Sequence, residues 1–422
     1  MSAQPKLADQ AAPAIPTRHG RDQTTARRVA RAIMGQLPRE LRRDPTPEQW
    51  AHIGQGLLRG DEPVDRLVSW MFATGMKTAR PLFEMALERG IQAVPDAPQP
   101  LRDFFAHIDA RPAWVDDARM DEGARACAVA GLDGMRALLV TGLMAGYQMS
   151  AVNRTLLATG TLEKGASRRV AETTKWWFDV TSVGGMQRFG AGFKNTIRVR
   201  LIHGMVRSHV QKLPDWDADY LGLPVNQTDM QATYFGFSAV FLLAQRLVGV
   251  PLTADERDAV MHLWRYIAWV NGVAEDMLHD PADAQNSATH MLYHNLLSQP
   301  MADADSQRLA RSLADEPLNR SYPTFKTLRQ HTAKWLQLSL ARACMDNATL
   351  RSLGLPVWQL PWYPLIAIPR NQLIHRTARL LPHGHDWLIR RGRAEQAAIL
   401  PILFGDSAPA IKEVGAPHPH GA

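Results

Sequence analysis

The sequence predicts an all-α protein that folds as a single large helical domain. Apolar residues recur three and four positions apart through most of the chain, and the alternating pattern of a half-buried strand is nearly absent. No repeat of fixed period and no Ser/Gly-rich hinge divides the 422 residues. An apolar content of 45% and 12 tryptophans are enough to build one large core.

The periodic segments place the helices in order along the chain. They are expected over residues 25–37, 46–58, 63–74, 78–89, 101–108, 122–159, 167–181, 193–211, 229–248, 253–270, 286–297, 303–314, 322–347, 371–381 and 387–404. The long segment 122–159 should break near Gly134 or Gly146, because glycine weakens a helix interior. Thr46 and Thr253 each precede Gln or Glu by three residues, a spacing that predicts capping boxes at two helix starts.

Composition divides the chain into one domain and two tails. Residues 1–20, rich in Ala, Pro and polar groups, predict a disordered N-terminal tail, and residues 406–422 a flexible C-terminal tail. The domain then spans 21–405, with the most informative core at 166–278. Within it, residues 353–364 are rich in proline and aromatics, and we expect them to form a packed loop.

Charge and cysteine usage exclude several classes of protein. The 48 basic and 41 acidic residues leave a net charge of +7, too diluted to favour a nucleic-acid surface. Cys127 and Cys344 predict free thiols in a reducing compartment, without a disulfide framework or structural zinc. No apolar run reaches the ~18 residues of a membrane span, and no export signal is recognisable. We therefore expect a cytoplasmic protein, monomeric or a small homo-oligomer.

The strongest candidate for a functional residue is His203, in the helix expected over 193–211. Its neighbours three and four positions away are two valines and two arginines, Val199, Arg200, Val206 and Arg207. A b-type haem needs an axial imidazole, apolar walls and cations for its propionates, so His203 can bind iron and Arg207 can hold the cofactor. Composition alone, however, favours a core histidine hydrogen-bonded to a neighbouring carbonyl.

The preceding helix carries a second candidate cluster. Arg169, Glu172, Thr173, Trp176 and Trp177 follow at helical spacing on one face, which is half polar and half aromatic. An ordinary ion pair between Arg169 and Glu172 is the simplest interpretation. In a haem pocket the same residues would supply a fixed cation and a base beside bound oxygen.

Four segments between about residues 166 and 278 resemble the catalytic core of the latex clearing proteins, the rubber oxygenases, and the wider MpaB-type oxygenase family. The segments are Arg169-x-x-Glu172-Thr173, Arg200-Leu-Ile-His203-x-x-Val-Arg207, Pro224-Val-Asn-Gln-Thr-Asp-Met-Gln-Ala-Thr233 and Leu263-Trp-Arg-Tyr-Ile-Ala-Trp-Val-Asn-Gly272-Val. Their order and spacing both fit, and the flanking segments are similar only in being helical.

The resemblance implies a globin-like helical bundle around haem b, with His203 as the proximal iron ligand and Arg169 and Thr173 on the distal side. It implies an enzyme that adds dioxygen to a carbon–carbon double bond and cleaves it into two carbonyl products. Glu172 stands where the family carries a lysine that can close onto the iron, so we expect a general base or gate there; Lys175, one turn along, can partly substitute for the lysine. Asn153 stands where an acidic residue would align.

The expected substrate is an apolar isoprenoid or lipid-like alkene, smaller than rubber, since solid rubber cannot enter a cell. The alternative is a non-catalytic helical protein that binds haem or another apolar ligand. Two other metal signals are weak: His290 and His294 have two-histidine zinc spacing without a third ligand, and Asp276 and His279 form half of a di-iron motif without its second half. The glycines of 184–192 predict a turn between helices.

Overall fold

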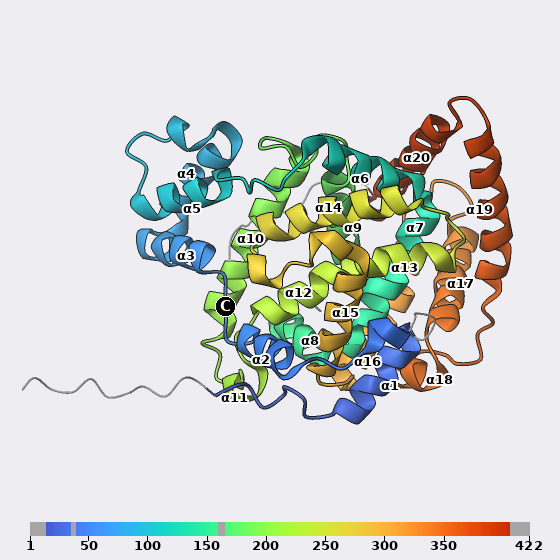
Figure 1. The fold of residues 1–422 in the computed structure, drawn as a ribbon, viewed down its shortest axis with the longest axis horizontal. Coiled ribbons are helices and arrows are strands. Elements are labelled where there is room, and N and C mark those ends of the chain that lie inside the picture. The colour runs from blue at the N-terminus through green and yellow to red at the C-terminus, as the bar shows by residue number, and fades with distance from the viewer. Residues whose placement is uncertain (1–13, 35–38, 159–164, 406–422) are drawn as a thin grey trace, which may run out of the picture.

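The computed structural model describes residues 14–34, 39–158 and 165–405, and every regular element in these ranges is helical. Figure 1 shows one body in which helices from distant parts of the chain enclose a common core, so the predicted all-α, single-domain fold is confirmed. The α-helices are α1 (Gln23–Met34), α2 (Pro47–Gly56), α3 (Glu62–Thr74), α4 (Met76–Arg89), α5 (Gln99–Asp109), α6 (Asp117–Val129), α7 (Gly131–Leu138), α8 (Ser150–Ala158), α9 (Ala166–Val180), α10 (Ala191–Val210), α11 (Ala218–Leu221), α12 (Gln227–Phe237), α13 (Ala239–Leu247), α14 (Ala254–Val270), α15 (Ala284–Leu297), α16 (Ala304–Asp315), α17 (Lys326–Cys344), α18 (Asn347–Ser352), α19 (Trp362–Leu380) and α20 (Gly384–Phe404).

The core lies around α14, α12 and α15, with α3–α5 on one side and α17–α20 on the other (Figure 1). α6 packs closely against α14, and glycine makes that approach possible. A Cβ atom on Gly123 would lie 2.4 Å from the carbonyl oxygen of Ala259. Only a residue without a side chain lets the two backbones meet at this distance.

The capping residues correctly predicted the starts of two helices. Both predicted capping boxes are present: the side chain of Thr46 accepts from the backbone of Gln49, and that of Thr253 accepts from the backbone of Glu256. The long segment 122–159 does break near Gly146, since the 3-10 turn Ala145–Gln148 ends at Met149 before α8. It also breaks at Ala130, four residues before Gly134. The chain bends by 91° there, and Gly131 adopts a φ of +57°, a conformation that glycine tolerates.

Two of the expected helices differ from the structure. The helix expected over 229–248 is interrupted at Ser238, where φ −106° and ψ −82° separate α12 from α13. α19 begins at Trp362, nine residues earlier than expected, despite two prolines. Pro364 lies in its first turn, where an N–H has no helical acceptor to lose.

The N-terminal boundary expected at residue 20 is also wrong, because Arg18 is buried inside the fold. Its guanidinium donates to Asp229 at 2.8 Å and to Gln299 at 3.0 Å. This pairing fixes residues 14–20 against α12, so they belong to the domain. The rest of the expected N-terminal tail, 1–13, and the C-terminal tail, 406–422, lie outside the described residues.

No single helix in the described ranges is both long and apolar enough to cross a membrane. One bent pair, Asp117–Val129 with Gly131–Gln148, meets the length and composition criteria together.

Candidate functional site

The α9–α10 hairpin positions the predicted site, and two hydrogen bonds fix its register. Trp176 Nε1 on α9 donates to Thr196 Oγ1 on α10 at 3.0 Å, and Asn195 Nδ2 donates to Asp179 at 2.8 Å. Partners whose numbers rise on one helix and fall on the other define an antiparallel pair. His203 lies seven residues beyond Thr196 on the same face of α10, level with residue 170 of α9. Arg169 is therefore on the segment opposite the imidazole.

His203 makes no hydrogen bond with any described residue, and its Nδ1 atom is buried without a partner. A core histidine normally satisfies both ring nitrogens, so the interpretation as a carbonyl-bonded core residue does not fit. Burial lowers the pKa of His203 to about 4, with the charge of Arg207 acting in the same direction. The imidazole is thus neutral at pH 7, the form that binds iron.

Two ion pairs, one buried and one partly exposed, hold α10 on α3, one on each side of His203. Arg200 donates to both carboxylate oxygens of Asp61, at 2.7 and 2.8 Å, and Arg207 Nε donates to Asp65 at 2.9 Å. These nitrogens of Arg200 and Arg207 are therefore paired within the protein. One buried nitrogen of Arg207, Nη2, has no hydrogen-bond partner among the described residues. The contact between Arg207 and a cofactor stays a prediction, and it would be made by this atom.

The last three of the four segments that carry the family resemblance contact one another around Arg200 and Arg207. Arg207 Nη1 donates to the carbonyl of Val225 at 2.5 Å, and Arg200 Nη1 to that of Val270 at 3.2 Å. Gln227 Nε2 then donates to the carbonyl of Gly272 at 2.9 Å. Gly272 itself has a φ of +91°, and a Cβ there would lie 2.0 Å from the Asp61 carboxylate. These motif residues therefore fix the helix that carries His203.

Tyr147 holds Arg169 in two ways. Its hydroxyl accepts a hydrogen bond from Arg169 Nη2, and the Cζ atom of Arg169 lies 5.8 Å from the centroid of its ring. Burial raises the pKa of Tyr147, so its hydroxyl stays protonated. Asn153, on α8, is buried and donates to the carbonyl of Tyr147 at 2.8 Å. Asn153 thus supports the tyrosine that orients Arg169.

The expected pairing of Arg169 with Glu172 is wrong. Glu172 accepts instead from Arg168 Nε at 2.6 Å, an i,i+4 pair at the rim of the site. Lys175 is likewise engaged, donating to Asp179 at 2.6 Å one turn along α9. Thr173 is half-buried and makes no hydrogen bond with any described residue. Of the polar residues predicted on this face, Arg169 and Thr173 are therefore the two not paired with another charge.

Apolar side chains lie on α10 and on its neighbour α8. Leu156 and Leu157 on α8 and Val199 on α10 are partly buried and pack against the core. α8 and α9 both contact α10, so apolar side chains, one imidazole and one guanidinium lie on three neighbouring helices. That donor set suits a macrocyclic cofactor, which supplies the remaining metal ligands itself.

The other metal signals have structural explanations. His290 and His294 both donate to the carbonyl of Arg43, at 3.2 Å. Asp276 pairs with Arg59, and His279 Nδ1 is hydrogen-bonded to the hydroxyl of Tyr234. Across the described ranges, no three or more His, Cys, Asp or Glu side chains form a group able to hold a metal ion.

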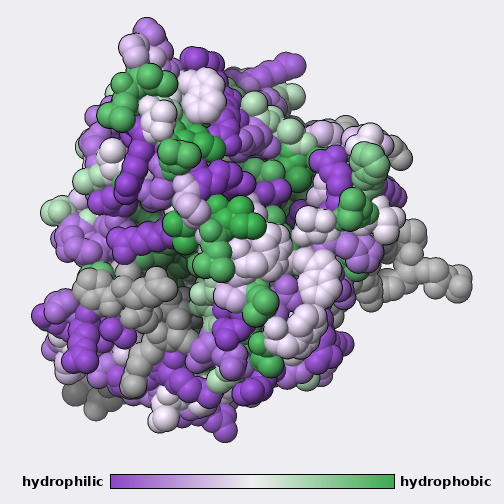
Figure 2. Space-filling view, turned by 90° about the vertical axis from the view of Figure 1, so that its right-hand side faces the viewer, coloured by the Kyte–Doolittle hydropathy of each residue, from purple (hydrophilic) through white to green (hydrophobic). Residues whose placement is uncertain are grey.

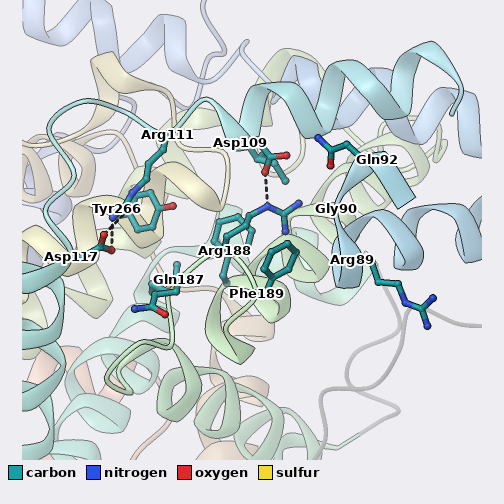
Figure 3. A pocket seen from close by; sticks show the side chains of 13 residues that line it. Arg89, Gly90, Gln92, Asp109, Arg111, Asp117, Gln187, Arg188, Phe189 and Tyr266 are labelled. Atoms are coloured by element: carbon teal, nitrogen blue, oxygen red, sulfur yellow. Dashed lines mark hydrogen bonds and ion pairs between the residues drawn. The ribbon is translucent and has the colours of Figure 1, made fainter. Parts of the chain in front are cut away.

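A cavity of about 340 Å³ lies away from the predicted site, where the end of α4 faces the α5–α6 loop and the turn before α10. Figure 3 shows Arg188 in it, paired with Asp109, and Arg111 paired with Asp117. Two of its three arginines, Arg111 and Arg188, are thus neutralised within the cavity. None of the predicted site residues lines it.

Residues 130–371 match the family described as ER-bound oxygenase mpaB/B′/rubber oxygenase, catalytic domain. The chain belongs to this oxygenase family. The match covers more than half of the sequence and includes every predicted site residue, so the predicted resemblance is confirmed and the protein is an oxygenase.

Two relatives agree with this assignment. The rubber oxygenase of Streptomyces sp. (strain K30) is 24% identical over 278 residues, which are 64% of this chain and 68% of the relative. The solved structure of latex clearing protein LCP in the closed state superposes with a TM-score of 0.56, at 18% identity, over 81% of this chain and 91% of that one. At this identity the second match demonstrates a shared fold.

Sequence reasoning missed Tyr147, Asp61 and Asp65. The two aspartates could have been found from their spacing. They are one turn apart at the start of an expected helix, and Arg200 and Arg207 are two turns apart on another, so the two helices carry complementary charges. Tyr147 carries none, since it lies in the 3-10 turn Ala145–Gln148, where helical spacing does not hold.

Proposed function

We propose that this oxygenase depends on haem b and adds dioxygen to a carbon–carbon double bond of an apolar, isoprenoid or lipid-like substrate. The observation that carries the proposal is His203, whose buried Nδ1 has no hydrogen-bond partner among the described residues, on the helix paired with the one that carries Arg169 and Thr173. An unpaired polar group at such a position costs stability unless a ligand uses it.

The residues present fit a haem. His203 would hold its iron, and the apolar side chains of Leu156, Leu157 and Val199 would hold the ring. Arg207 Nη2, buried and without a partner, would be the contact for a propionate. When bound, the haem would supply an iron centre that activates dioxygen for attack on the alkene.

The chain's own groups would orient the reactants. Arg169, fixed by Tyr147, would place a positive charge beside the oxygen, and Thr173 would donate a hydrogen bond to it. The apolar walls would exclude water and accept the alkene. Glu172 would act as base or gate only after leaving Arg168, so we expect it to move before it takes a proton.

The test is oxygen-dependent product formation. Haem-reconstituted protein is incubated with polyisoprene or with squalene, in air and under argon, and carbonyl products are measured. We expect products in air alone, with squalene converted faster than the polymer. Arg169→Gln should lower the rate by about a hundredfold, the scale of losing one positioned electrostatic group, while Arg89→Gln, at an exposed position on α4, should not.

Two outcomes would contradict the proposal. Protein that takes up no haem cannot be a haem oxygenase. Protein that binds haem but forms no oxygen-dependent product with either alkene would be the non-catalytic haem-binding protein that the sequence also allows.

A further inference from the structure

Helix α19 presents an apolar stripe to solvent. Leu365, Leu373 and Leu380 recur at i, i+8 and i+15, which places them on one face, and they are 74%, 70% and 85% exposed. Helices of soluble domains normally turn such a stripe inward. The inner face of α19 is occupied instead by small and polar residues such as Ala367 and Asn371.

The apolar surface continues onto α17 and the 353–361 connector. Trp335 on α17 contacts Trp358 on the connector, with ring centroids 5.6 Å apart. Of the sixteen exposed large apolar residues in the described chain, twelve lie between 325 and 387: Phe325, Leu328, Trp335, Trp358, Leu360, Leu365, Ile366, Ile368, Leu373, Leu380, Leu381 and Trp387. Figure 2 looks onto the side where α19 lies, and hydrophobic residues form a broken band across its middle. Patches of this kind mark interaction sites.

The same part of the chain is strongly basic. Residues 326–393 contain eleven Lys or Arg and two Asp or Glu, a charge of +9, which exceeds the +7 of the whole chain. Four of these cations, Lys326, Arg351, Arg376 and Arg390, are exposed and make no ion pair within the described residues. Arg376 stands within the α19 stripe itself.

We propose that the surface formed by α17, the 353–361 connector and α19 docks on a bilayer containing anionic lipid. Leucine and tryptophan side chains can enter the acyl-chain layer of a bilayer, while arginines without an ion pair bind the anionic headgroups above it. Tryptophan is enriched at the boundary between these two layers. The net charge argues against a second copy of this chain, because two such faces would repel. The helix lies on the membrane and does not cross it.

The experiment is vesicle co-sedimentation of the full chain, with neutral phosphatidylcholine vesicles or with vesicles containing phosphatidylglycerol. We expect binding to the anionic vesicles, weakened by salt as a surface charge interaction should be. Lys326→Gln and Arg376→Gln should each weaken binding about fivefold. Leu365→Ser and Leu373→Ser should each weaken it about tenfold, because each removes a leucine that enters the apolar layer.

Matched controls come from elsewhere on the surface. Phe72 on α3 is 44% exposed, and Arg89 on α4 is exposed, so Phe72→Ser and Arg89→Gln should bind like the wild type. Circular dichroism and thermal midpoints check that each variant folds. The proposal is overturned if neither vesicle binds, if neutral and anionic vesicles bind equally, or if the α19 variants behave like the controls. It is also overturned if light scattering finds an oligomer that Leu365→Ser with Leu373→Ser converts to a monomer.

Discussion

The Asp61–Arg200 pair should contribute more to stability than any surface ion pair of this protein, because both side chains are almost completely buried. Arg200 is 2% and Asp61 3% exposed, and two nitrogens of Arg200 meet the carboxylate at 2.7 and 2.8 Å. Asp61→Ala leaves a buried guanidinium with one remaining acceptor, the carbonyl of Val270. Breaking a buried pair in this way costs about 3–5 kcal/mol, a large fraction of the ~5–15 kcal/mol that stabilises a typical domain.

The assay is a double-mutant cycle in urea, followed by tryptophan fluorescence and circular dichroism. Asp61→Ala and Arg200→Met should each lower the free energy of unfolding by about 3–5 kcal/mol. The double variant should lose less than the sum of the two, with a coupling of about 2 kcal/mol or more, because it leaves no charge unpaired. Glu62→Ala is the control: its pair with Arg66 is 76% and 65% exposed, and it should cost less than about 0.5 kcal/mol.

Additive losses in the cycle would refute this reasoning, since they would mean that the two side chains do not stabilise each other. A loss below about 1 kcal/mol for Asp61→Ala would refute it as well, because a buried unpaired guanidinium should cost more than that.

Three further predictions follow from buried contacts. Burial lowers the pKa of His279 to about 3, so the unfolded chain binds more protons than the folded one below pH 6.5. The free energy of unfolding should therefore decrease as the pH is lowered, by about 2.7 kcal/mol from this residue at pH 4.5. His279→Asn should reduce that decrease in urea titrations. Gly123→Ala should destabilise by about 1–3 kcal/mol, because its Cβ would meet the Ala259 carbonyl at 2.4 Å, and an unchanged urea midpoint would contradict that packing. Thr196→Val should lose about 1–3 kcal/mol by leaving Trp176 Nε1 unpaired, whereas Thr196→Ser, measured alongside, should lose much less.

Local features of the fold could be predicted from the sequence. The expected bounds of the helices that became α9 and α10 differ from the structure by at most two residues at any end. The capping boxes at Thr46 and Thr253 were also predictable, because a cap depends on residues three positions apart. The choice of His203 rested on the same local periodicity, and no hydrogen bond in the structure accounts for its side chain.

Contacts between distant residues could not be predicted. Arg18 looked like part of a tail because its partner, Asp229, lies 211 residues away. Arg169 was expected to pair with the nearest carboxylate, but Arg168 occupies Glu172 and leaves Arg169 to Tyr147. Sequence spacing identifies which charges can meet along one helix, whereas tertiary packing decides which of them do.

The central claim is that His203 binds haem iron, and an absorption spectrum tests it most directly. Wild type, His203→Ala and the control His209→Ala, an exposed histidine on the same helix, are titrated with haem. A Soret band typical of an axial imidazole in the wild type and in His209→Ala, lost in His203→Ala and restored by added imidazole, is the predicted result. A wild type that takes up no haem, or a His203→Ala spectrum identical to that of the wild type, would contradict the claim.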